Sequence, residues 1–175
     1  MNDKLEALLS KQDIHELSCR YMRGLDRHDG ELMLDQFWRN GWCEYGFYNS
    51  PPKEFITFCM TALKDHISNQ HLIGNVLIDI EGDEAFGEVY FQAYHKLAGE
   101  NGLEDLIIAG RYLDRYERRN DVWKIAYRSE VVDWTRSEPS NEPYFEMAPD
   151  CLRGGRQDDA VFRRDNRYQG SKGET

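Results

Sequence analysis

Apolar side chains recur at helical spacing in the first part of the chain and alternate with polar ones in the second part. Residues 3–27 show the clearest helical pattern, which predicts a helix with one buried face. That face consists of Leu5, Leu8, Leu9, Ile14, Leu17, Tyr21 and Leu25. A neighbouring stripe ends unusually in a carboxylate, and its members are His15, Cys19, Met22 and Asp26.

Two shorter helices and a strand are expected next. The pair Asp29-Gly30 ends the first helix, and residues 31–38 form a short amphipathic helix. Residues 42–48 fit a strand. A turn at 49–52 then starts a third helix, with Ser50 as N-cap and Pro51 in the first turn, and this helix ends near residue 65. Its predicted buried face is Phe55, Phe58, Cys59, Ala62 and Leu63.

The second half of the chain alternates in the way typical of strands. Four strands are predicted, over residues 71–81, 85–97, 106–118 and 122–134. Tight turns at 81–83 and 119–121 and a longer connection at 99–102 join them. Helices followed by an antiparallel meander predict an α+β fold, with three N-terminal helices packed in a curved, mainly antiparallel sheet. The apolar interior of such a fold, open at one end, is the natural place for a ligand.

Composition narrows the function classes. The formal net charge is −10 over 175 residues, and no basic cluster occurs in the first 150, so nucleic acid is not expected as a partner. The arginines between residues 153 and 167 alternate with aspartates and fit a solvated tail. The four cysteines form no CxxC unit, which argues against a zinc site and for reduced thiols. No apolar run is long enough to cross a membrane, and we expect a cytoplasmic protein.

Beyond residue 136 the chain becomes rich in Ser, Pro, Glu and Asn. We therefore expect one folded domain over residues 1–136 and an extended tail over 137–175. The tail is a candidate for packing on a neighbouring subunit. It could also close the pocket.

Three segments resemble the SnoaL-like branch of the NTF2-like superfamily over about residues 5–135. They are Tyr21-Met-Arg-Gly-Leu-Asp26, Asn69-Gln-His71 and the segment 110–128 with its Tyr-Glu-Arg-Arg hairpin and Trp-Lys. The branch includes scytalone dehydratase, a bile-acid dehydratase and hexachlorocyclohexane dehydrochlorinase. The resemblance implies a cone-shaped NTF2-like (cystatin-like) fold. Many relatives with this fold are not enzymes, so the resemblance alone leaves catalysis open.

By the same resemblance, the catalytic pair of the branch falls on Asp26 and His71. Tyr21 stands where the dehydrochlorinase has Lys, which favours loss of water over loss of halide, and Arg128 matches a cavity arginine. A histidine is the side chain best suited to move protons near neutral pH, and a carboxylate on its other nitrogen fixes the tautomer. The alternatives are structural: Asp26 pairs with a nearby arginine on the surface, and Tyr21 is an ordinary core residue.

Arg128 poses a problem of parity. Trp123, Ile125 and Tyr127 share one strand face by alternation, and Arg128 falls on the other. If the Trp123 face is the core, Arg128 reaches the interior only past a β-bulge. Arg111 is expected to pair with an acidic group. The remaining candidates, for substrate binding, are Tyr45, Tyr94, His95 and Trp134.

The sequence thus predicts a cofactor-independent lyase, with no metal, that acts on a small hydrophobic aromatic or alicyclic substrate. Water is the favoured leaving group, while halide and formaldehyde remain open. The alternatives are a ketosteroid-isomerase-like isomerase, a non-catalytic ligand-binding or assembly module, and the small subunit of a ring-hydroxylating oxygenase. The exposed face of a single sheet usually needs cover, so a homo-oligomer is expected. The resemblance favours a trimer.

Overall fold

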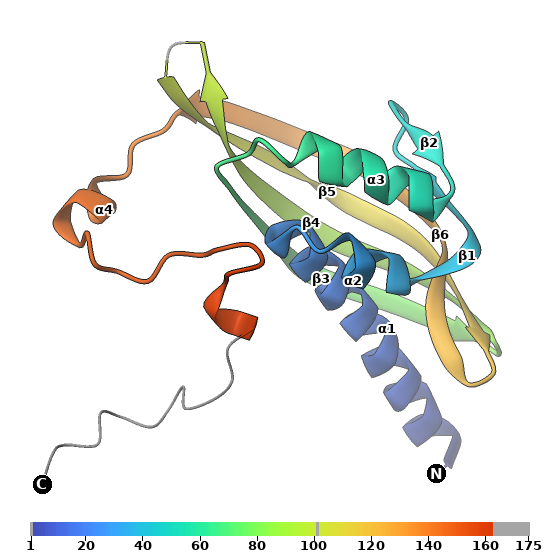
Figure 1. Cartoon of the computed structure of the whole chain (residues 1–175). Coiled ribbons are helices and arrows are strands. Elements are labelled where there is room, and N and C mark those ends of the chain that lie inside the picture. Colours follow the sequence, from blue (N-terminus) through green and yellow to red (C-terminus); the bar gives the residue numbers. More distant parts are fainter. Residues whose placement is uncertain (1, 101, 163–175) are drawn as a thin grey trace, which may run out of the picture.

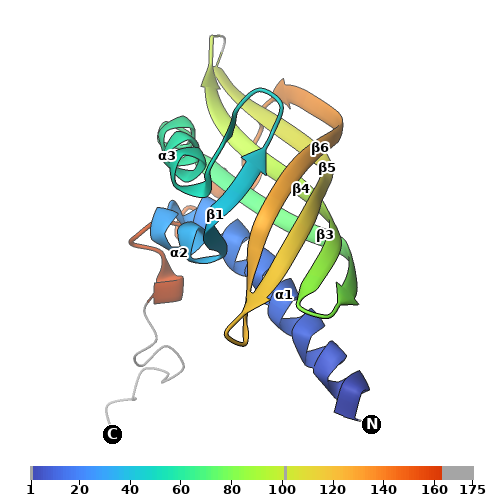
Figure 2. The same ribbon diagram turned by 90° about the vertical axis from the view of Figure 1, so that its right-hand side faces the viewer.

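The fold is a curved sheet with helices on one side, as the computed structural model of the chain shows for residues 2–100 and 102–162 (Figure 1). Six strands form the sheet in the order β2-β1-β6-β5-β4-β3. All neighbouring pairs are antiparallel except β1 and β6, which are parallel. Figure 2, seen from the side, shows helices α1, α2 and α3 together on one face of the sheet. The predicted α+β class and NTF2-like architecture are confirmed.

Helix α1 (Asn2–Arg27) packs on β3, and its N-terminal turns project beyond the sheet (Figure 1). Its core contacts begin at Ile14, which is completely buried. The prediction that the whole apolar stripe faces the core was wrong for the N-terminal end of the helix. Leu5, Leu8 and Leu9 are 54%, 64% and 57% exposed, because the sheet does not reach that far.

The segment after α1 differs from the prediction in its boundaries. Helix α2 spans Gly30–Asp35, and its first turn is capped by the carboxylate of Asp29, which accepts from the Leu32 amide at 2.9 Å. Strand β1 spans Phe37–Glu44, starting earlier than predicted because Phe37 pairs with Ile125 in β6. Residues 45–48 form a loop to the short strand β2, Asn49–Ser50.

Helix α3 spans Pro52–Ala62, so it starts later and ends earlier than expected. Ser50 is not its N-cap: Ser50 lies in β2, and Pro51 occupies the cap position without a side-chain bond. The prediction of which residues of α3 are buried was also partly wrong. Phe55, Ile56 and Leu63 are buried, whereas Phe58 and Ala62 are exposed.

The antiparallel meander is confirmed, with strands longer than predicted. They are β3 (Ser68–Glu81), β4 (Glu84–Gly99), β5 (Gly102–Arg119) and β6 (Val122–Pro139). Asn120 and Asp121 both have positive φ, 51° and 61°, as a two-residue hairpin turn of the primed type requires.

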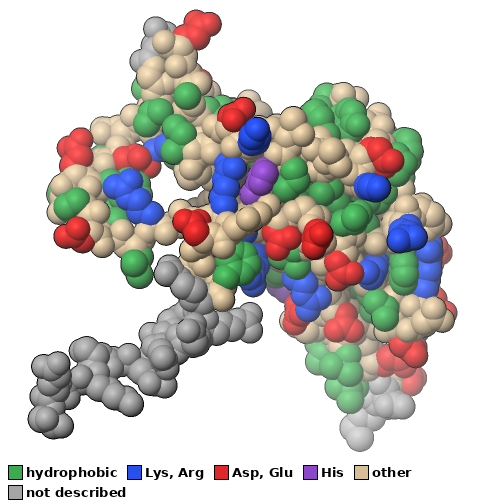
Figure 3. All heavy atoms as spheres, in the orientation of Figure 1, with side chains coloured by type: hydrophobic (Ala, Val, Ile, Leu, Met, Phe, Trp, Pro, Cys, Tyr) green, Lys and Arg blue, Asp and Glu red, His purple; other side chains and the backbone are tan. Residues whose placement is uncertain are grey.

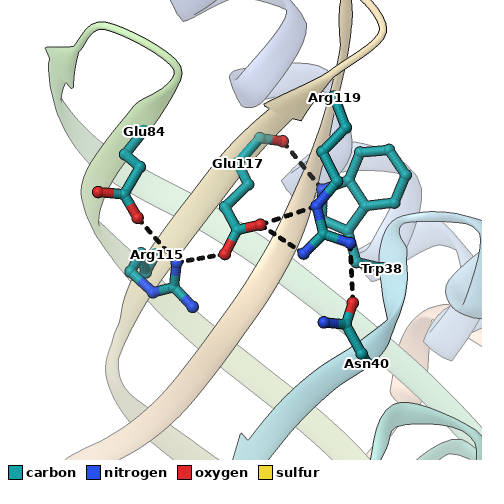
Figure 4. A network of polar contacts seen from close by, with 6 residues as sticks. All are labelled: Trp38, Asn40, Glu84, Arg115, Glu117 and Arg119. Carbon is teal, nitrogen blue, oxygen red and sulfur yellow. Dashed lines mark hydrogen bonds and ion pairs between the residues drawn. The ribbon is translucent and has the colours of Figure 1, made fainter.

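A polar network ties the β5–β6 hairpin to β1 and β4 (Figure 4). The indole Nε1 of Trp38 donates to the Glu117 carbonyl oxygen at 2.9 Å, and the Arg119 guanidinium lies 4.6 Å from the Trp38 ring centroid. Glu117 also pairs with Arg115 and Arg119. The network is completed by Asn40, which accepts from Arg119, and Glu84, which accepts from Arg115.

The described part of the C-terminal tail returns to its own cone. It contains α4 (Pro143–Met147) and a 3₁₀ turn at Ala160–Phe162 (Figure 1). Arg156 donates to the carbonyl oxygens of Leu63 and His66 at 2.8 and 2.7 Å. Arg27 pairs with Asp159 at 2.6 Å. Packing of the tail on a neighbouring subunit stays a prediction.

Charges of both signs are intermingled over the face in Figure 3, where part of the tail stands clear of the cone. Within residues 2–100 and 102–162, no helix is long and apolar enough to span a bilayer.

Candidate active site

Asp26 and His71 lie in direct contact. His71 Nδ1 is 2.7 Å from Asp26 Oδ1, and the His71 backbone amide donates to the same carboxylate at 2.9 and 3.2 Å. Both side chains are largely buried, 13% and 5% exposed. Since the carboxylate can only accept, Nδ1 carries a hydrogen, and in the neutral form of the imidazole Nε2 holds the lone pair. The geometry is that of an oriented base.

The end of α1 and the start of β3 create this contact. His28, with φ of 55°, terminates α1, and its ring bonds to the Met60 carbonyl oxygen at 2.7 Å. Gly24 allows α2 to approach closely, because a Cβ there would lie 2.3 Å from Met33 Cγ. These two features fix the last turn of α1 against α2 and α3. Asp26 is therefore held where β3 begins.

Two further histidines adjoin the pair. Asn69 Oδ1 accepts from Nδ1 of His66 at 2.8 Å and from Nδ1 of His95 at 2.9 Å. The His95 ring centroid lies 5.2 Å from that of His71. Burial, together with the neighbouring imidazoles His71 and His66, lowers the pKa of His95 to about 3. His95 is therefore neutral at physiological pH. It is placed beside the candidate base, as a cavity histidine would be.

Three tyrosines pack together in the interior of the cone. The Tyr21 and Tyr45 hydroxyl oxygens are 3.1 Å apart, and the Tyr112 ring lies within about 6 Å of both rings, at 6.1 and 6.2 Å. Burial raises the pKa of all three phenols well above its ordinary value, so they are neutral hydrogen-bond donors. Tyr21 is only 1% exposed, as the alternative of an ordinary core residue predicts, and its role in a site stays a prediction.

The β-bulge that Arg128 requires is present. In the β5–β6 ladder Tyr116 faces Ile125 and Arg115 faces Tyr127, which leaves Ala126 as the extra residue. Arg128 is consequently buried inside the cone, with Nε and Nη2 bonded to the Asp114 carboxylate at 2.8 and 2.7 Å. A buried charge is tolerated when paired and hydrogen-bonded in this way.

Glu130 escaped the sequence reasoning, as did the interior residues Tyr112 and Asp114. Glu130 lies opposite Tyr112 in the ladder, two residues after Arg128, and is partly exposed. Burial raises its pKa to about 7, while Arg128 acts in the opposite direction. The signal for it was present, because residues two apart on a strand share a face.

Two of the predicted substrate-binding residues lie apart from this group. Tyr94 neighbours His95 in β4 and so faces the other side of the sheet, where its hydroxyl donates to Asp105 at 2.7 Å. Trp134 is 49% exposed, and a second bulge, between Val132 and Trp134, turns it away from the face that carries Arg128. Arg111 pairs with Glu88 and Asp133.

The main cavities in the described part of the chain are lined by none of the predicted catalytic and substrate-binding residues. One of about 800 Å³ lies between α2 and the start of α3, lined among others by Leu34, Phe37, Pro51 and Lys124. In the described part of the chain, no three His, Cys, Asp or Glu side chains converge as metal ligands would.

Comparison with known proteins identifies the family. The SnoaL-like domain profile matches residues 6–129, most of the chain. The chain belongs to the SnoaL-like family. No curated protein matches it significantly.

Solved structures agree on the SnoaL-like fold. A type-3 hexachlorocyclohexane dehydrochlorinase from Novosphingobium barchaimii matches with a TM-score of 0.71 and 18% identity, covering 79% of this chain and 97% of its own. A candidate scytalone dehydratase from Novosphingobium aromaticivorans matches with a TM-score of 0.69 and 19% identity, covering 81% of this chain and 94% of its own. A protein of unknown function with a cystatin-like fold from Nostoc punctiforme matches with a TM-score of 0.59 and 25% identity, covering 71% of this chain and 92% of its own. The SnoaL-like superfamily thus includes dehydratases, dehydrochlorinases and proteins without an assigned reaction.

Proposed function

We propose that the protein is a cofactor-independent lyase that eliminates water from a small ring compound, with His71 as the base and Asp26 as its orienting carboxylate. The observation that carries the proposal is the 2.7 Å contact between His71 Nδ1 and Asp26. It supports a fixed tautomer with a free basic nitrogen in a largely buried site. Proton transfer to such a group typically accelerates a reaction ~10²–10⁴-fold.

The proposed reaction is a 1,2-elimination next to an electron-withdrawing group. His71 Nε2 takes the proton from the acidic carbon, and the C–H electron pair becomes the new double bond. The C–O bond at the neighbouring carbon breaks, and the departing hydroxide takes the proton from the His71 imidazolium to leave as water, which returns His71 to its neutral form. The Tyr21–Tyr45 hydroxyl pair supplies neutral donors for the oxygen that gains charge. Arg128 contributes less free charge than the sequence alone suggested, because Asp114 neutralises it.

The experiment uses ketones whose acidic C–H bonds report base catalysis without any leaving group. We would measure deuterium uptake into 2-tetralone in D₂O by mass spectrometry, and enone formation from cyclic β-hydroxy ketones by ultraviolet absorbance. Asp26→Asn and His71→Gln should each lower the exchange rate ~10²-fold or more while the circular dichroism spectrum is unchanged. His66→Gln is the matched control, since His66 belongs to the same cluster but has no contact with Asp26. Equal rates in all four proteins, or no wild-type rate above that of buffer, would refute the proposal.

One observation favours a second candidate, a non-catalytic binding module. Tyr21 and Tyr112 are only 1% and 3% exposed, and none of the main cavities of the described chain is lined by Asp26 or His71. This candidate predicts that the wild-type protein exchanges the protons of 2-tetralone no faster than buffer does. The same experiment therefore separates the two.

The remaining expectations are also proposals. We propose that the chain assembles as a homo-oligomer through the open face of the sheet. Large apolar side chains are exposed there, including Leu72, Leu77, Phe86 and Leu113. Sedimentation velocity would show a single 20.6 kDa species if this is wrong.

A further inference from the structure

Arg128 has a donor that nothing in the described chain satisfies. Its guanidinium is completely buried, and Asp114 accepts from Nε and Nη2. Nη1 is buried as well and has no hydrogen-bond partner among the described residues. A buried donor without an acceptor is strongly unfavourable, and such groups are rare in folded proteins unless a ligand or water uses them.

Glu130 is a second interior acid, beside Asp114, that lies close to Arg128 along β6. Its side chain lies on the same face of β6 as that of Arg128, two residues and about 7 Å further along the strand. In the described structure, the Glu130 carboxyl forms neither a hydrogen bond nor an ion pair, with Arg128 or with any other residue. It is partly exposed while Arg128 is not. An acceptor and a donor, both unused, thus lie on the same inner face of β6.

The aromatic surroundings of this pair define the shape of what could lie between them. Tyr112 faces Glu130 directly in the ladder, and the Arg128 guanidinium lies 4.2 Å from the Tyr112 ring centroid and 4.5 Å from that of Tyr21. The charge of Glu130 also contributes, after burial and the neighbouring tyrosines, to the raised pKa of Tyr45. Flat aromatic walls around two polar groups suit a ring that carries a polar substituent.

A neutral hydroxyl is the group that satisfies both partners at once. Its oxygen accepts from Nη1 of Arg128 and its hydrogen is donated to the Glu130 carboxylate. An anionic ligand would meet repulsion from Glu130, and a halogen or plain hydrocarbon would leave both groups unsatisfied. We infer that Glu130 and Arg128 Nη1 together bind a hydroxyl group of the substrate, so that the proposed lyase acts on hydroxylated rings. This inference rests on the proposed function and adds a substrate class to it.

The test measures binding of ring probes that differ only in this group. Intrinsic-fluorescence titration of the full-length protein would compare 2-naphthol, 2-methoxynaphthalene and naphthalene. We expect 2-naphthol to bind at least tenfold more tightly than the other two, since the methoxy oxygen accepts but cannot donate. In Glu130→Leu this preference should fall to within about twofold, and Glu130→Gln, whose amide still donates and accepts, should retain most of it. Glu138→Leu, an exposed carboxyl on the same strand, should behave as wild type.

Equal affinity of the wild-type protein for the three probes would overturn the inference, and that comparison needs no variant to fold. A preference that persists unchanged in Glu130→Leu would overturn it too. The proposed base is tested separately. Deuterium exchange that depends on His71 without any hydroxyl preference refutes only the hydroxyl site, whereas a hydroxyl preference without exchange refutes only the lyase.

Discussion

Glu130 should make the stability of the protein depend on pH in an unusual direction. Its pKa is about 7 in the folded protein against an ordinary value of 4.5, because burial disfavours the charged form. A folded-state pKa above the unfolded one means that the folded protein binds the proton more tightly. The stabilising contribution is therefore fully present below about pH 4.5 and is lost as the pH rises through about 7.

The magnitude follows from the two pKa values. Between pH 5 and pH 8, this single group lowers the free energy of unfolding by about 2.5 kcal/mol. Glu130→Gln removes the titration and keeps the shape. The free energy of unfolding of the variant relative to wild type should therefore rise by about 2.5 kcal/mol from pH 5 to pH 8.

Urea unfolding at both pH values and at one protein concentration measures this quantity. Any effect of the new glutamine side chain on stability that does not depend on pH cancels when the two pH values are compared. Glu138→Gln, on the exposed part of the same strand, should show a change near zero. The reasoning would be refuted if the difference in free energy of unfolding between Glu130→Gln and wild type were the same at both pH values to within about 0.5 kcal/mol.

Three further predictions concern the interior. Asp114→Asn should lower the free energy of unfolding by about 3–5 kcal/mol, because Arg128 then remains as an uncompensated buried charge; a loss below about 1 kcal/mol in urea would contradict this. Gly110→Ala should cost at least about 1–3 kcal/mol, since its Cβ would lie 2.1 Å from the Val131 carbonyl oxygen, whereas Gly74→Ala has its nearest contact at 3.8 Å and should cost far less. The His95 ring resonances should not titrate between pH 8 and pH 5 in ¹H–¹⁵N spectra, because its pKa is about 3; a midpoint above 5 would show that the ring is solvated.

The sequence was informative where a local pattern determines the structure. The helix ending at Arg27 and the hairpin at Asn120-Asp121 follow from spacing and turn chemistry alone. The contact between Asp26 and His71 joins residues 45 positions apart, and only the resemblance predicted it. Such a contact depends on how two elements pack, which no local period encodes.

The errors have the same origin. Periodicity showed that Leu5 belongs to an apolar stripe, but not that the sheet ends before reaching it. Alternation separated the two faces of β4, yet it could not say that His95 is inside and Tyr94 outside. Glu130 was overlooked because an acidic residue late in a strand is ordinarily solvent-facing. Its interior position follows from that of Arg128, two residues earlier, and so depends on the same bulge in the β5–β6 pairing.

The bulge at Ala126 has a consequence for how this protein could diverge. A single added residue in β6 inverts the inside-outside parity of the positions that follow it as far as a second bulge, between Val132 and Trp134, so Arg128 and Glu130 owe their interior places to it. Deleting one residue there would turn both charged groups toward the convex side in one step, without changing either side chain. Among homologues, the length of this short stretch is therefore as informative about the chemistry of the cavity as the identity of the residues that line it.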